Sequence, residues 1–179
     1  MKIIYPNVEK LLEFHSKIIK IWLEKWEWWS FWFLWWKDES DLKSIIEFIK
    51  NDNYYPRLED KITHLMFSVN KNHIFMDWNK RSSIYFSAYF LSLNIFDNYL
   101  VEKYIRELED VAIYVADNKI SKSLLWDIIQ CLINYEEYSE ELKLKIYNSI
   151  TARKKIKNLK QNPLNFEWKK YFKKSKKKD

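Results

Sequence analysis

The sequence predicts an all-α domain of about seven helices, and three observations support this fold class. Apolar residues recur every three or four positions along most of the chain, and no run shows the sustained alternation that is typical of a strand. Residues that cap helices stand in front of several apolar segments. The chain has 179 residues, which suits one domain with a buried core, and we expect a domain over 1–150 with a basic extension over 151–179.

Each helix is predicted by its own apolar stripe or segment. In chain order, we expect helices over 8–22, 42–49, 58–69, 84–93, 101–115 and 124–132, followed by one that begins after Ser139. The segment over 84–93 is apolar at nearly every position, which is typical of a buried central helix. The capping residues that we expect are Ser40, Asp97 or Asn98, Ser121 and Ser139.

A connector separates the second and third predicted helices. It reads Asn-Asp-Asn-Tyr-Tyr-Pro over 51–56. Asparagine and aspartate favour turns, and Pro56 disfavours a helical conformation at Tyr55. We therefore expect a break in the helical structure here, with room for a short extended flap near 51–56.

The composition excludes several classes of protein. The chain has ten tryptophans and no glycine, although average usage of about 7% predicts roughly 12 glycines at this length. Without glycine there is no phosphate-binding P-loop and no dinucleotide-binding fingerprint. The single cysteine, Cys131, forms no intramolecular disulfide and has no metal-ligand spacing to a histidine, which fits a reducing cytoplasm.

Neither a secretory signal nor a membrane span is predicted. The first residues lack an apolar run of signal-peptide length. The densest apolar stretch, 28–36, is nine residues long, whereas a membrane-spanning helix needs about 20. We therefore expect a soluble cytoplasmic protein with no membrane partner.

The positive charge is confined to the end of the chain. The formal net charge is +6, and residues 169–179 alone contain seven lysines and one aspartate, so the rest of the chain is neutral. We expect this tail to be a disordered, solvated end. The alternative is that its lysines contact nucleic acid.

One segment, 73–81, concentrates the groups that carry chemistry. It contains His73, Asp77, Asn79, Lys80 and Arg81, directly before the predicted central helix. A helix N-terminus strengthened by two cations can hold phosphate oxygens, a carboxylate can place Mg²⁺ between them, and a histidine can accept a proton from an attacking hydroxyl. These residues point to phosphoryl or nucleotidyl transfer. A polar helix cap with a surface histidine is the alternative that they leave open.

The same segment resembles the signature of the Fic/Doc (Fido) superfamily, which is histidine-x-phenylalanine-x-aspartate-small-asparagine. Here it reads His-Ile-Phe-Met-Asp-Trp-Asn-Lys-Arg from His73 to Arg81. In Fic enzymes that transfer AMP, a glycine follows the asparagine; here Lys80 stands at that position, as in the death-on-curing (Doc) branch. The resemblance extends from about Leu11 to Asn94 and implies a Fido-type helical bundle.

The resemblance also implies a function. A Doc-like protein would be the toxin of a type II toxin–antitoxin module, and would transfer the γ-phosphoryl group of ATP to a hydroxyl of a protein, in the family a threonine of elongation factor Tu. Its cofactor would be Mg²⁺, and a cognate antitoxin would cover the active-site groove. Two alternatives are a Fic-type transferase that moves AMP or another nucleotide to protein hydroxyls, and a catalytically silent Fido-fold binding module.

The family pattern assigns roles by position. His73 would be the catalytic base, and Asp77 would bind Mg²⁺ or orient the nucleophile. A phosphate clamp would be formed by Asn79, Lys80 and Arg81. Phe75 would be the buried anchor of the loop, and Tyr54 and Tyr55 would belong to a flap that docks the target.

Trp78 departs from the pattern, because the family has glycine or another small residue where the backbone turns toward phosphate. Taken literally, the indole predicts a silent site. A second hypothesis is that the ten tryptophans are glycines encoded by UGA, as in some bacterial lineages, since glycines over 22–36 would give a flexible loop and would restore the small residue at 78. Tryptophan UGG codons at Trp28, Trp29 and Trp78 would refute this hypothesis.

Overall fold

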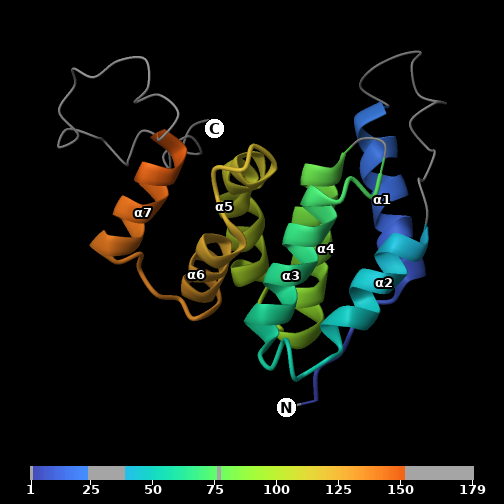
Figure 1. Ribbon diagram of the computed structural model, residues 1–179. Coiled ribbons are helices and arrows are strands. Elements are labelled where there is room, and N and C mark those ends of the chain that lie inside the picture. The colour runs from blue at the N-terminus through green and yellow to red at the C-terminus, as the bar shows by residue number, and fades with distance from the viewer. Residues whose placement is uncertain (1, 24–38, 76–77, 152–179) are drawn as a thin grey trace.

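The computed structural model describes residues 2–23, 39–75 and 78–151 (Figure 1). These residues form seven α-helices and no strand, which confirms the all-α class. The helices are α1 (Val8–Leu23), α2 (Glu39–Ile49), α3 (Leu58–Lys71), α4 (Asn79–Asn94), α5 (Asn98–Ala116), α6 (Lys122–Ile133) and α7 (Glu140–Thr151). The tail beyond 151, the tryptophan-rich segment over 24–38 and Asp77 lie outside the described residues.

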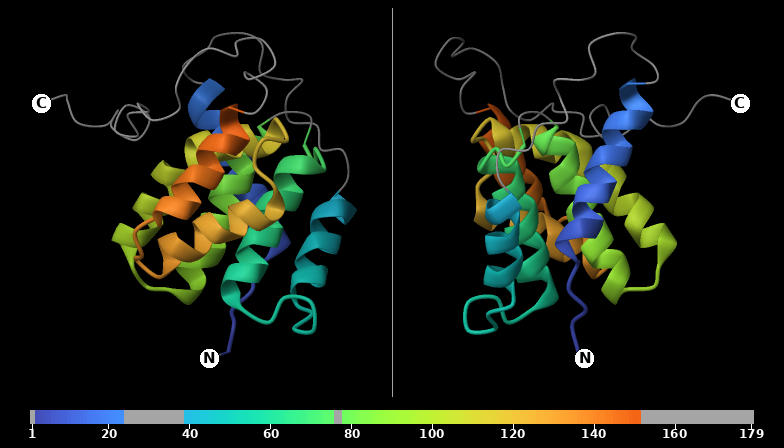
Figure 2. Two further views of the ribbon diagram at one scale, coloured as in Figure 1. Left: turned by 60° about the vertical axis from the view of Figure 1, so that its left-hand side comes forward. Right: turned by 90° about the vertical axis from the view of Figure 1, so that its right-hand side faces the viewer.

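α4 is the central helix, as its composition predicts. It packs against α1, α3 and α5, and Figures 1 and 2 show it running between them. Three serines are fully buried in α4, Ser82, Ser83 and Ser87. The hydroxyl of Ser87 donates to the carbonyl of Ser83 at 2.7 Å, so this polar group is satisfied within its own helix. Because these side chains of α4 are small, the neighbouring helices pack closely against α4. This packing holds the N-terminus of α4 in place.

Several helix ends follow the predicted capping chemistry. The Asp97 carboxylate accepts a hydrogen bond from the backbone N–H of Leu100 at 3.0 Å, and the Ser121 hydroxyl accepts one from Leu124 at 3.2 Å. Ser139 caps α7 in the same way. The prediction that Ser40 caps the next helix is wrong, because α2 already begins at Glu39 and Ser40 lies inside it.

The connector before α3 is a tight turn, with no extended flap over 51–56. The carbonyl of Asn51 accepts hydrogen bonds from the backbone N–H groups of Tyr54 and Tyr55, at 3.2 and 3.0 Å. The fully buried Lys61 holds this turn from α3, since its ammonium donates to the Ile49 carbonyl and to the Asp52 carboxylate, both at 2.7 Å. These bonds tie the last turn of α2 to the start of the connector.

Most apolar stripes predicted from the sequence face one continuous core. Among the described residues, no helix combines the length and the apolar character that crossing a bilayer would require.

Candidate functional site

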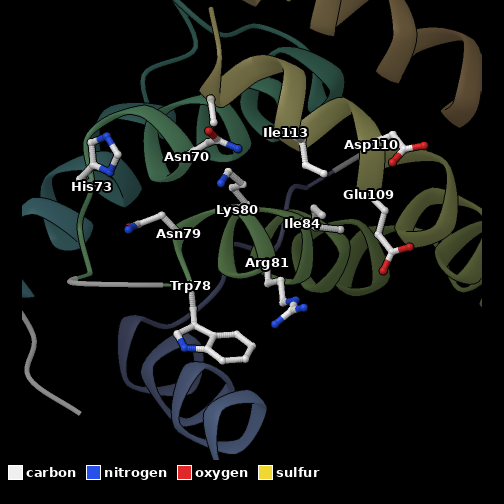
Figure 3. A pocket seen from close by; sticks show the side chains of 11 residues that line it. Asn70, His73, Trp78, Asn79, Lys80, Arg81, Ile84, Glu109, Asp110 and Ile113 are labelled. Carbon is white, nitrogen blue, oxygen red and sulfur yellow. The ribbon is translucent and has the colours of Figure 1, made fainter. Parts of the chain in front are cut away.

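A cavity of about 710 Å³ lies where the end of α3, the start of α4 and the C-terminal half of α5 meet. This volume is within the range of small-molecule sites in proteins. Figure 3 shows His73, Asn79 and Trp78 on one side of the cavity, Lys80 and Arg81 near its centre, and two carboxylates of α5 on the other side. The residues that line it are Asn70, His73, Trp78, Asn79, Lys80, Arg81, Ile84, Glu109, Asp110, Ile113 and Ala116.

The loop that carries His73 is anchored by aromatic packing. Phe75 is 2% exposed, and its ring stacks on the ring of His15 with a centroid separation of 3.7 Å. His15 lies on α1, is itself buried, and its Nδ1 is 2.7 Å from the Ser82 hydroxyl of α4. The rings of Phe75 and Phe86 form a T-shaped pair. Phe75 thus lies where a loop anchor would have to lie, while His73 remains exposed at the cavity.

Asn79 closes this loop by a double hydrogen bond. Its Oδ1 accepts from the backbone N–H of Phe75 at 2.9 Å, and its Nδ2 donates to the carbonyl of Phe75 at 2.8 Å. Asn79 is the first residue of α4 and is 8% exposed. Both ends of its amide are therefore used to fix the loop onto the helix, and this is the interaction that the structure shows for this residue.

The first turn of α4 has a strongly positive character. It contains Lys80 and Arg81, both exposed, and no acidic residue. Because the helix dipole is positive at this end, two cations here oppose the usual preference for acidic side chains. Trp78, the N-cap, provides no side-chain capping bond. Such an N-terminus attracts an anion. The anion would offset the unfavourable positive charges and would accept hydrogen bonds from the first backbone N–H groups of the helix.

Trp78 has a left-handed backbone, with φ 67° and ψ 11°. Glycine adopts this conformation without cost, whereas a bulky residue there is an outlier. Its indole lines the cavity, and the Arg81 guanidinium lies 4.4 Å from the ring centroid. The backbone at 78 therefore has a conformation that favours glycine, and His73, Asn118 and the bulky Tyr135 share this left-handed conformation.

The α5 wall of the cavity was not expected from the sequence. Glu109, Asp110 and Ile113 come from the C-terminal half of α5, and Asn70 comes from the last turn of α3. Exposed acids on an amphipathic helix give no signal in the sequence, because most of them only face solvent. The sequence also has no signal that distinguishes Asn70 and His15 from ordinary buried polar residues.

The structure brings together five of the predicted site residues, namely His73, Trp78, Asn79, Lys80 and Arg81. It does not bring Tyr54 and Tyr55 to the cavity. These tyrosines precede α3 whereas His73 follows it, and a helix of this length separates its two ends by about 21 Å. Figure 1 shows the two connections at opposite ends of α3.

The predicted metal ligand, Asp77, lies outside the described residues. Within the described part of the chain, no three histidine, cysteine, aspartate or glutamate side chains converge as a metal site would require. Such a trio is not needed by Mg²⁺ in nucleotide sites, where one or two carboxylates and the substrate phosphates hold the ion.

Comparison with protein-family models gave a match over residues 35–91 to a family described as the Fic/DOC family. This segment contains α2, α3, the His73 loop and most of α4. Comparison with curated proteins gave no match, and comparison with solved structures gave none either. The match at residues 35–91, together with the all-α fold, supports a protein-modifying enzyme or a binding module of the Fic/Doc superfamily.

Proposed function

We propose that the protein is a Doc-like toxin kinase, which transfers the γ-phosphoryl group of ATP to a hydroxyl of a protein. The observation that supports it best is that one cavity is lined by His73 and by the cationic first turn of α4. The imidazole is a base of suitable type, and the helix start is an anion site. By resemblance, the protein target is elongation factor Tu and the partner that controls the toxin is a cognate antitoxin.

The proposed reaction needs few groups from the protein. The hydroxyl oxygen of the target forms a bond to the γ-phosphorus while the bond from that phosphorus to the departing ADP oxygen breaks. His73 accepts the hydroxyl proton. Lys80 and Arg81 neutralise the charge that builds up on the transferred oxygens. Asp77 would hold Mg²⁺, which, when bound, reduces the repulsion between the phosphates and the incoming oxygen.

Asn79 has a different part in this proposal from the one its position in the family pattern suggests. Because its amide is already bonded at both ends to Phe75, we propose that it is a positioning residue. It holds the His73 loop against α4, so that the base and the phosphate-binding turn keep a fixed relation.

The two alternatives to the kinase are a transferase that moves AMP and a silent binding module. Transfer of AMP uses the same base and helix start, but Lys80 takes the place of the glycine of AMP-transferring Fic enzymes, which favours the kinase. A silent binding module is favoured by Trp78, whose indole lines the cavity where the ligand would bind.

The test is to incubate the purified protein with elongation factor Tu and ATP labelled on either the γ- or the α-phosphate. The kinase moves only the γ label onto protein, whereas the nucleotidyl transferase moves only the α label. His73→Ala is expected to abolish transfer while helicity is unchanged, and His64→Gln, which changes a histidine outside the cavity, is expected to retain it. Arg81→Lys should reduce transfer, because a point charge cannot reproduce a forked contact to phosphate. Absence of both labels would refute either transferase.

A further inference from the structure

A cluster of ionisable side chains lies outside the cavity, where the start of α6 meets α3 and the connector before it. The Lys122 ammonium lies 2.6 Å from Nδ1 of His64 and 3.4 Å from the Tyr55 hydroxyl, and it is 4.9 Å from the centroid of the Tyr55 ring. The other ring nitrogen of His64 lies 3.3 Å from the hydroxyl of Ser68. These four residues do not line the cavity, and the proposed transfer reaction does not use them.

The contact between Lys122 and His64 sets the position of the hydrogen on the imidazole. An ammonium has three donors and no acceptor, so Nδ1 of His64 presents its lone pair to Lys122. The ring hydrogen is then on Nε2, where the Ser68 hydroxyl accepts it. His64 is therefore neutral, and the amine of Lys122 is in direct contact with a base.

The positive charge of Lys122 is poorly stabilised. Lys122 is the first residue of α6, where the helix dipole is positive and disfavours a cation. It is half-buried, and in the described part of the chain it forms no ion pair. The oxygens of the nearby Asp60 carboxylate already accept hydrogen bonds from Nε1 of Trp126 and from the backbone N–H of Arg57. Burial lowers the pKa of Lys122, and the charge of Asp60 opposes this only in part.

Two other lysines with little exposure have the opposite surroundings. The ammonium of Lys71 donates to the Ala116 carbonyl at 3.2 Å, at the C-terminal end of α5, where the helix dipole favours a cation. The buried Lys61 forms an ion pair with Asp52 at 2.7 Å. Lys122 differs from both, because a neutral imidazole takes the place of the carbonyl or the carboxylate. A desolvated amine beside a base loses its proton more readily and is then a nucleophile.

We propose that Lys122 is a site of covalent acylation, with an acyl phosphate as the acyl donor and His64 as the group that accepts the amine proton. The ammonium first releases one proton to water. The lone pair of Nζ then forms a bond to the acyl carbon, and the bond from that carbon to the phosphate oxygen breaks. Inorganic phosphate leaves with the electron pair, Nδ1 of His64 accepts a proton from the nitrogen, and an uncharged amide remains. The positive pole of α6 favours an acyl donor whose leaving group is an anion.

Incubation of the purified protein with acetyl phosphate at neutral pH tests this proposal. Chymotryptic digestion and mass spectrometry then give the acetylation rate at each lysine. Lys122 is expected to react at least about tenfold faster than Lys71 and Lys145, since a positioned base assists the proton transfer. Lys71 is the control for a half-buried lysine, and Lys145, which is exposed and paired with Glu141 at 2.9 Å, is the control for access.

The dependence on pH gives a second measurement. As the pH is raised from neutral, the rate at Lys122 should reach its plateau before the rate at Lys145. Burial lowers the pKa of Lys122, whereas the hydrogen bond to Glu141 raises the pKa of Lys145. The groups that face the Lys122 ammonium are the Tyr55 hydroxyl, the His64 imidazole and, at a longer distance, the Asp60 carboxylate.

The variant His64→Gln removes the base and keeps a polar side chain. It should lower the rate at Lys122 by at least about tenfold and leave the rates at Lys71 and Lys145 unchanged. A rate at Lys122 that is no higher than the two control rates in the wild type, or that is unchanged in His64→Gln, would overturn the proposal. If the rate at Lys71 also rises in the variant, the fold has been disturbed and the wild-type comparison decides. These rates are independent of the nucleotide-labelling experiment, so the two proposals stand or fall separately.

Discussion

The side-chain amide of Asn79 forms two hydrogen bonds with the backbone of Phe75, one at each end, at 2.9 and 2.8 Å. This pair joins the first residue of the central helix to the loop that presents His73. Phe75 is at the same time stacked on His15 from α1. The position of the candidate base therefore depends on the contact between Asn79 and Phe75, which are four positions apart in the sequence, and on the packing of Phe75 against α1.

Asn79→Ala is expected to weaken both the fold and the activity. The substitution leaves the N–H and C=O of Phe75 without partners in a buried position, which costs about 1–3 kcal/mol of unfolding free energy. Displacement of His73 should lower transfer by at least about tenfold. Denaturant unfolding and the γ-label assay measure the two effects. Asn98→Ala, at an exposed asparagine of α5, should change neither, and an Asn79→Ala protein with wild-type stability would contradict the assignment.

Trp78→Gly is expected to stabilise the protein. A left-handed residue with a Cβ atom costs roughly 1–2 kcal/mol more than glycine, and the larger conformational freedom of glycine in the unfolded chain offsets part of this gain. We therefore expect Trp78→Gly to be more stable than Trp78→Ala by about 1 kcal/mol in thermal or denaturant unfolding. The alanine variant is the matched control, since it removes the indole and keeps the Cβ. Equal stability of the two variants would mean that the backbone at 78 is not left-handed in solution.

Stability should fall in mild acid because of His64. Burial, together with the positive charge of Lys122, lowers the pKa of His64 from 6.5 to about 4. The Lys122 ammonium lies 2.6 Å from Nδ1 of this histidine, so protonation would place two cations side by side. The unfolded chain then binds the proton more readily than the folded one. The stabilising contribution is complete above pH 6.5 and is lost as the pH falls toward 4.

Unfolding of the wild type and of His64→Gln, measured between pH 4 and pH 7, tests this expectation. The wild type should lose about 1–2 kcal/mol more than the variant over this range, a figure reduced to allow for solvent screening of a half-buried ring. Parallel curves for the two proteins would show that His64 titrates normally.

Lys61→Met is expected to loosen the turn before α3. The buried ammonium of Lys61 holds the carbonyl of Ile49 and the carboxylate of Asp52, and methionine keeps the apolar stem but has no donor. Loss of these bonds should lower the free energy of unfolding by about 1–3 kcal/mol. Hydrogen exchange should also become faster over 49–55. The control is Lys43→Met, at an exposed ion pair of α2, whose effect should stay within about 0.5 kcal/mol.

The sequence by itself determined the helical class, the central helix and the segment that carries the candidate chemistry. Apolar spacing shows which positions of a helix are buried, and Asp97, Ser121 and Ser139 mark helix starts through bonds to residues three positions away. Such interactions are local, so they can be predicted without knowledge of the neighbours. Ser40 failed as a cap because serine is also tolerated within the first turn of a helix.

Only the tertiary structure decided what surrounds the His73 loop. Spacing shows that a face is buried but does not show which helix covers it. The contact of His15 with Ser82 joins residues 67 positions apart, and the approach of Glu109 and Asp110 to the start of α4 follows from how α5 packs on the central helix. The same packing placed Tyr54 and Tyr55 at the far end of α3 from the cavity, because a rigid helix separates the segments at its two ends.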